Sequence, residues 1–142
     1  MIAVDANVLI KAYVPEVLSE NAEKMLQEAG KQGLMLVVPD LIFPEIGNIL
    51  WKKSRLNELT NEEVNEILGE IISLPVKVEP CRSLACLAIE IAMAHGITMY
   101  DSIYFSLALV YKTKLITADR KLVARMKAGE FGGHIEWLGH YA

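Results

Sequence analysis

The sequence predicts an α/β fold in which helices cover both faces of a parallel β-sheet. Short apolar runs alternate along the 142 residues with longer segments whose apolar positions recur at three- and four-residue spacing. This alternation favours parallel strands joined by helical crossovers. No linker, low-complexity segment or internal repeat interrupts it, so we expect a single domain over residues 1–142.

Five short runs are predicted to form the strands of the sheet. The first two are apolar, several contain Val or Ile, and each ends at a polar residue, glycine or proline. Pro39 stops the second run, and the third lies between Pro75 and Pro80. The predicted strands cover residues 2–4, 34–38, 75–80, 114–117 and 134–138.

Six longer segments are predicted to be helices. Asp40 is expected to cap the second of them, and Thr60 with Glu63 forms a capping box at the third. Gly96 is the expected C-cap of the fourth. Two helices lie between the third and fourth strands, which is one more than a simple crossover needs. The predicted helices cover residues 16–31, 41–53, 61–73, 82–95, 100–111 and 119–127.

Composition narrows the classes of function. The formal net charge is -4, so the chain does not resemble a basic protein that coats nucleic acid. A nucleic acid remains a possible substrate if a metal ion supplies positive charge at the site. The hydrophobic share of 53% hints at apolar surface buried between subunits. Cys81 and Cys86 show no zinc-ligand spacing and are expected to be small buried residues without a disulfide.

The N-terminus carries no secretory signal, because it lacks a basic region and Asp5 interrupts its apolar run. No stretch approaches the roughly 18 uninterrupted apolar residues of a membrane span. We therefore expect a cytoplasmic protein without membrane contact.

Four acidic residues are predicted to meet at one edge of the sheet. Asp5 and Asp119 follow the first and fourth strands, and ligands of open parallel sheets bind at the carboxyl ends of the strands. Glu45 and Asp101 are the odd acidic residues on otherwise apolar helix faces, near the N-terminus of each helix. Each alone has an ordinary explanation as a turn, cap or first-turn residue. Together they point to one site.

Clustered carboxylates repel, by about 4 kcal/mol for two charges ~4 Å apart at an effective dielectric of ~20. No Lys or Arg lies inside the four motifs to neutralise them. All-oxygen ligands without His or Cys favour Mg²⁺ or Mn²⁺. The sequence therefore predicts a divalent metal site at Asp5, Glu45, Asp101 and Asp119. Asn7 and Thr117 are candidates for supporting polar residues, or are ordinary turn residues.

Other features of the sequence keep two interpretations open. A set of lysines and arginines forms either solvated helix faces or contacts to RNA phosphates. Four aromatic side chains either stack on unpaired bases or pack in the core or an interface. The basic residues are Lys11, Lys52, Lys53, Arg55, Arg120, Lys121, Arg125 and Lys127, and the aromatic ones are Tyr13, Trp51, Tyr100 and Tyr104.

Four segments in order resemble the PIN-domain ribonucleases, and in particular the small VapC-type toxins of prokaryotic toxin–antitoxin pairs. They are VDANVL at 4–9, PEIGNIL at 44–50, YDSIYFSLA at 100–108 and LITAD at 115–119. No single segment is specific, but the ordered set covers almost the whole chain. The family's acidic positions fall on Asp5, Glu45, Asp101 and Asp119, and its polar positions on Asn7 and Thr117.

The resemblance implies a complete biochemical picture. It implies an α/β/α sandwich with strand order 3-2-1-4-5 and a Mg²⁺- or Mn²⁺-dependent endoribonuclease acting on RNA. It also implies a homodimer and a small VapB-type antitoxin that occludes the acidic pocket.

Three alternatives remain open at the level of sequence. The first is a PIN nuclease of RNA processing or quality control. The second is a haloacid-dehalogenase-like phosphatase, which would want an Asp where Asn7 stands. The third is a receiver-like binding module, which would want an acidic pair at the end of the first strand.

Overall fold

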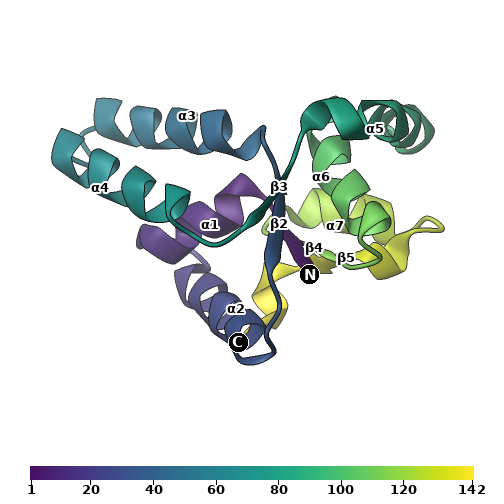
Figure 1. Cartoon of the computed structure of the whole chain (residues 1–142), viewed down its shortest axis with the longest axis horizontal. Coiled ribbons are helices and arrows are strands. Elements are labelled where there is room, and N and C mark those ends of the chain that lie inside the picture. Colours follow the sequence, from purple (N-terminus) through teal and green to yellow (C-terminus); the bar gives the residue numbers. More distant parts are fainter.

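The computed structural model describes residues 1–142 and places all five strands in one parallel sheet. The order is β3-β2-β1-β4-β5, and each neighbouring pair is parallel. The predicted fold class and strand order are therefore confirmed (Figure 1). The strands are β1 (Ile2–Val4), β2 (Leu36–Pro39), β3 (Lys77–Glu79), β4 (Leu115–Thr117) and β5 (Ile135–Trp137).

Seven helices flank the sheet in two layers. Figure 1 shows α1 to α4 on one side of the strands and α5 to α7 on the other. Two short 3₁₀ turns, Gly132–His134 and Leu138–His140, precede and follow β5. The helices are α1 (Ala6–Tyr13), α2 (Ser19–Lys31), α3 (Ile42–Arg55), α4 (Asn61–Ile72), α5 (Cys81–His95), α6 (Met99–Val110) and α7 (Arg120–Lys127).

Helix α6 is the most deeply buried helix and packs against β1, β2 and β4. All residues from Ser102 to Ala108 are buried. The two buried serines are satisfied, since the Ser102 hydroxyl donates to the Ala88 carbonyl and the Ser106 hydroxyl donates to the Ser102 carbonyl. Fully burying a side chain such as Phe105 stabilises the fold by about 1.5–3 kcal/mol. The first turn of α6, which carries Asp101, is therefore held on a rigid support.

Helix α1 is an element that the sequence pattern did not reveal. Residues 6–13 form a helix directly after β1, and Asp5 is its N-cap, with the Val8 N–H donating to Asp5 Oδ1 at 3.1 Å. The segment is apolar almost throughout and buries Val8, Leu9 and Ile10, so it shows little helical periodicity. A buried helix of this kind cannot be distinguished by pattern from the end of a buried strand.

Helix α2 begins at Ser19, later than the predicted start at residue 16. The Ser19 hydroxyl accepts from the Glu16 N–H at 2.8 Å and donates to the Val14 carbonyl at 2.9 Å. Leu18 has a left-handed backbone conformation with φ of 68°. These bonds make residues 14–18 a turn between α1 and α2.

Asp40 does not cap α3, contrary to the prediction. Leu41 precedes α3 and provides no side-chain cap, whereas Asp40 Oδ1 accepts from the Cys81 N–H at 2.9 Å at the start of α5. This contact lowers the pKa of Asp40, with the bond from Cys81 as the main cause. The ends of β2 and β3 lie side by side, which brings Asp40 next to Cys81 although the two residues are far apart in sequence. A local sequence pattern cannot show such a contact.

The two cysteines are free, as expected, but the predicted burial is wrong for Cys86, which is exposed; Cys81 is partly exposed. Cys86 lies on the solvent side of α5, whose buried face consists of Leu84, Ala88, Ile91 and Ala92. The predicted capping box is confirmed, with Thr60 Oγ1 accepting from the Glu63 N–H at 3.1 Å.

No helix on its own has the length and apolar content of a membrane span. Helices α5 and α6 together reach that length and apolar content, but the chain bends by 113° between them.

Candidate active site

Asp5 and Thr117 lie side by side because β1 and β4 are neighbours, with Val4 in register with Ile116. The Thr117 hydroxyl donates to Asp5 Oδ2 at 2.6 Å and accepts from the Asp119 N–H at 3.1 Å. Asp5 Oδ1 takes the helix-capping bond from Val8. The Asp5 carboxylate is thus fixed at both oxygens, and Thr117 links it to the loop that carries Asp119.

Glu45 enters the site from the first turn of α3. Its neighbours Ile42 and Ile46 are fully buried, which draws the carboxylate inward. Glu45 Oε1 is buried without a hydrogen-bond partner, and so is the hydroxyl of Tyr104 on α6. Burial raises the pKa of Glu45, and the nearby Tyr104 hydroxyl opposes this rise in part, although the two groups lack hydrogen-bond geometry. An acceptor left unpaired in this way is costly unless another group binds it.

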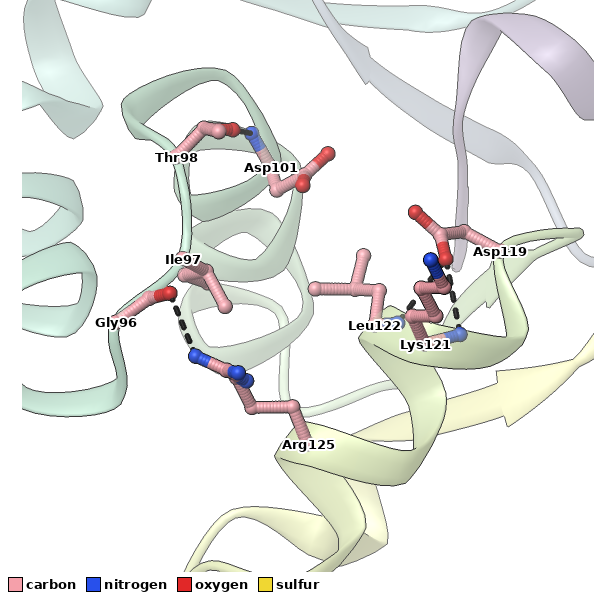
Figure 2. Close-up of a pocket in the computed structure, with 8 residues that line it drawn as sticks. All are labelled: Gly96, Ile97, Thr98, Asp101, Asp119, Lys121, Leu122 and Arg125. Carbon is pink, nitrogen blue, oxygen red and sulfur yellow. Dashed lines mark hydrogen bonds between the residues drawn. The ribbon is translucent and has the colours of Figure 1, made fainter.

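Asp101 and Asp119 face each other across an open pocket of about 220 Å³ between α6 and α7. Figure 2 shows their carboxylates pointing toward one another, with Leu122 and Ile97 below them. Asp119 caps α7, where Oδ1 accepts from the N–H groups of Lys121 at 3.0 Å and Leu122 at 3.1 Å.

The Asp101 N–H donates to Thr98 Oγ1 at 3.1 Å, which fixes the first turn of α6. Its carboxylate is directed into the pocket, and the Thr98 side chain is near enough to oppose in part the rise in pKa that burial causes.

The acidic groups influence one another electrostatically. Burial raises the pKa of Asp5 to about 6 despite the opposing bonds from Thr117 and Val8, and the charges of Asp101 and Glu45 raise it further. Burial also raises the pKa of Glu45 and of Asp101, with added contributions from Asp101 on Glu45 and from Asp119 on Asp101. These influences link Asp5, Glu45 and Asp101 with one another and Asp119 with Asp101. That all four form one site stays a prediction.

Two cationic side chains line this pocket. The sequence had indicated them only as members of a general basic surface. Lys121 and Arg125 border it together with Asp101 and Asp119, but neither forms an ion pair with them. Arg125 instead donates to the Gly96 carbonyl at 2.9 Å (Figure 2). Their spacing of four residues on α7, one helical turn, is the signal that would have placed them on the same face.

Asn7 is not brought into the cluster by any hydrogen bond of its side chain. It lies exposed on the first turn of α1. Thr117 is completely buried, so of the two supporting residues expected from the sequence only Thr117 contacts an acid.

The residues present fit a hard divalent cation. All four side chains offer oxygen, Glu45 Oε1 has no partner, and the charges of Glu45 and Asp101 act on Asp5. No three His, Cys, Asp or Glu side chains form a closed ligand set in this structure. Mg²⁺ suits such an arrangement, since it usually keeps several waters and takes only one or two protein carboxylates directly.

Replacing Thr117 with Val should lower the free energy of unfolding by about 1.5–3 kcal/mol. The change keeps the shape of the side chain but removes a buried hydrogen bond to a carboxylate and leaves the Asp119 N–H without its acceptor. Urea unfolding at neutral pH measures the effect. Thr113→Val is the matched control, because its hydroxyl bonds the Met1 carbonyl at an exposed position. Equal losses in the two variants would contradict the role of the buried network.

Comparisons with known proteins agree with this geometry. A family model described as PIN domain matches residues 2–128. Ribonuclease VapC3 of Pyrobaculum aerophilum is 34% identical over 129 residues, which cover 89% of this chain and 95% of the relative. Exonuclease VapC9 of the same organism is 28% identical over 120 residues, covering 84% of this chain and 85% of the relative.

Solved structures share the fold. PAE2754 from Pyrobaculum aerophilum superposes with a TM-score of 0.70 at 26% identity, over 98% of this chain and 84% of that one. VapBC2 from Rickettsia felis, bound to a promoter DNA fragment, gives a TM-score of 0.67 at 16% identity over 96% of this chain and 98% of that one. At this lower identity the likeness concerns the fold alone.

Proposed function

This chain belongs to the PIN-domain family, and from that membership we propose that it is a metal-dependent endoribonuclease that hydrolyses RNA phosphodiester bonds. The observation that carries the proposal is that Asp5, Glu45 and Asp101 influence one another electrostatically, as Asp119 does Asp101, while none of the four forms an ion pair. The family membership replaces the phosphatase and receiver-module interpretations that the sequence alone left open.

Asp5 and Glu45 from the buried side, and Asp101 and Asp119 from the open side, would hold Mg²⁺ or Mn²⁺. When bound, the cation offsets the charge of the carboxylates and of the phosphate and polarises a phosphoryl oxygen. Thr117 keeps the Asp5 carboxylate in place through its hydrogen bond of 2.6 Å.

The open pocket is where the protein can receive the phosphodiester and the attacking water. The Asp101 carboxylate is directed into this pocket, where it can accept a hydrogen bond from water. In hydrolysis the water oxygen bonds to phosphorus, the ester bond to the leaving oxygen breaks, and a proton from water passes to a carboxylate. Lys121 at the same pocket supplies a cation toward the incoming phosphate.

A cleavage assay with purified protein tests the proposed activity. We expect cleavage of single-stranded RNA with Mg²⁺ or Mn²⁺, its loss in chelator, and its loss in Asp5→Asn. Lys24→Ala, an exposed change on α2, should cleave like the wild type. Cleavage that persists in chelator and in Asp5→Asn would refute the proposal.

An exonuclease is the second candidate, because the relative VapC9 is named an exonuclease. The pocket between Asp101 and Asp119 is open to solvent, so a strand can reach it without a free end. A circular single-stranded RNA separates the two activities. We expect the circle to be opened, whereas an exonuclease would leave it intact and degrade only the linear form.

We further propose that the protein acts in the cytoplasm as the toxin of a toxin–antitoxin pair, as a homodimer whose acidic pocket a VapB-type antitoxin occludes. The support is the resemblance to VapC-type toxins and the name of the relative VapC3. Expression in a bacterial host should arrest growth, and Asp5→Asn should not. Unimpaired growth during confirmed cleavage would instead favour a PIN nuclease of RNA processing. A monomer at micromolar concentration in light scattering would contradict the dimer.

A further inference from the structure

A second pocket lies on another face of α7 from the acidic one. Its lining comes from Arg120, Val123, Ala124 and Lys127 of α7 and from Trp137 and His140, and its volume is about 440 Å³. The four α7 residues follow the spacing i, i+3, i+4 and i+7, so they form one stripe along the helix. We call these six residues the outer α7 stripe. The stripe begins at Arg120, the residue next to Asp119. The acidic pocket is lined by other residues of α7, so the width of this helix separates the stripe from that pocket.

The outer α7 stripe carries uncompensated positive charge in a chain of net charge -4. Helix α7 contains no acidic residue, and neither Arg120 nor Lys127 forms an ion pair. Two acids adjoin the stripe in sequence. Asp119 caps α7 and lines the acidic pocket, and Glu136 pairs with Lys114 at 3.2 Å and approaches His140 at 3.8 Å. Arg120 and Lys127 therefore remain available to an anionic ligand.

Arg120 and Trp137 form a prearranged stacking platform. The Arg120 guanidinium lies 3.7 Å from the centre of the Trp137 ring. A Cβ placed on Gly139 would come within 2.2 Å of this ring, so only glycine permits the close packing that holds the indole. The His140 ring meets the indole edge-on at 5.6 Å. A nucleobase can stack on a guanidinium plane fixed in this way.

We propose that the outer α7 stripe binds an unpaired segment of the RNA substrate outside the cleavage site, with a base stacked at Arg120 and a phosphate at Lys127. This proposal rests on the proposed function, since it assumes that RNA occupies the acidic pocket. A helix with its side chains is about 10–12 Å wide, so a strand that leaves the pocket beside Asp119 can cross the start of α7 onto the stripe. The combination of a stacking platform with a separate cation fits single-stranded nucleic acid better than an acidic peptide.

Binding is measured apart from cleavage, in the Asp5→Asn background with chelator. The probe is a fluorescently labelled single-stranded RNA of about 12 nucleotides, within the usual range of site sizes for such proteins. Arg120→Gln should weaken binding about tenfold through lost stacking. Lys127→Gln should reduce the slope of log K against log salt by about 0.7, the value for one phosphate contact on a single strand. Lys24→Gln on α2 is the matched control and should change neither quantity.

Trp137 fluorescence provides a second readout. Trp51→Phe leaves Trp137 as the only tryptophan, because the chain has two. RNA should quench this fluorescence, and Arg120→Gln should reduce the quenching. Arg120 and Lys127 are exposed, so the variants are expected to fold.

Three outcomes would overturn the proposal. The first is that affinity and salt slope are unchanged in both variants. The second is that RNA does not quench the Trp137 fluorescence. The third is that polyglutamate displaces the labelled RNA as effectively as unlabelled RNA does. Confirmed cleavage with any of these results would refute the outer α7 stripe but not the nuclease. Binding that depends on Arg120 and Lys127 without cleavage by the wild type would refute the nuclease and retain a nucleic-acid site.

Discussion

Replacing Asp5 with Asn is expected to stabilise the metal-free protein at neutral pH even though it removes cleavage. Burial raises the pKa of Asp5 from its ordinary value of 3.8 to about 6. Between these two pH values the folded state holds a proton that the unfolded state has released. The free energy of unfolding of the wild type therefore falls as pH rises through this window, and the penalty is complete above pH 6.

The size of the effect follows from the pKa. One pKa unit corresponds to about 1.4 kcal/mol, so the charged Asp5 costs up to about 3 kcal/mol above pH 6. Asn does not titrate, its one side-chain oxygen can accept the bond from Val8, and its amide NH2 can donate to the Thr117 hydroxyl. In urea unfolding with chelator, Asp5→Asn should have a higher free energy of unfolding than the wild type at pH 7.5, and the two values should be nearly equal at pH 4. A constant difference at both pH values would contradict the burial of a strained carboxylate.

Asp40→Asn is a control in which the change in the free energy of unfolding should have the opposite sign. The bond from Cys81 lowers the pKa of Asp40, so its stabilising contribution is present above the unfolded pKa and is lost as pH falls through the folded pKa. Asp40→Asn should therefore cost stability at neutral pH and less under acid conditions. Parallel behaviour of the two variants would point to a general charge effect.

Addition of Mn²⁺ or Mg²⁺ should produce the second large change, a rise in stability confined to neutral pH. A cation that binds only the folded state at 100 times its Kd adds about 2.7 kcal/mol. It offsets the charges that raise the pKa of Asp5, Glu45 and Asp101. Because protons compete for the same oxygens, the gain should shrink as pH falls through about 6, the pKa of Asp5.

Thermal unfolding over a range of Mn²⁺ concentrations measures this gain. Glu45→Gln should reduce it, since the amide keeps one oxygen but removes the negative charge at the buried position where Oε1 has no partner in the protein. Glu20→Gln, at an exposed position on α2, is the control and should respond like the wild type. An equal response in Glu45→Gln and the wild type would place the cation elsewhere.

The sequence predicted most strands because they are short apolar runs bounded by proline, glycine or polar residues, whereas β3, which is Lys-Val-Glu and largely exposed, was marked by the prolines on either side of it. It also predicted that acids at strand ends would meet, since the carboxyl ends of parallel strands share one edge of a sheet. Glu45 and Asp101 were predicted because an acid on an apolar helix face is unusual. The strand order came from family resemblance, because local pattern does not specify which strands pair.

Other features depend on contacts between segments distant in sequence. Residues 6–13 are apolar enough to suit a strand or a buried helix. In the structure they form helix α1, which packs against α2 and α3. Asp40 caps α5 because β2 and β3 bring it to Cys81. Cys86 is exposed because α5 turns its other face to the core.

The sequence by itself determined the layered α/β fold and singled out four candidate carboxylates, since hydrophobic periodicity and strand-end position are local properties. Only the tertiary structure decided the protonation and partners of those carboxylates. Burial raises the pKa of Asp5, Thr117 reaches it across two strands, and Glu45 Oε1 stays unpaired. Desolvation and hydrogen bonding depend on what surrounds a group in space, and residues far apart in the chain supply those surroundings.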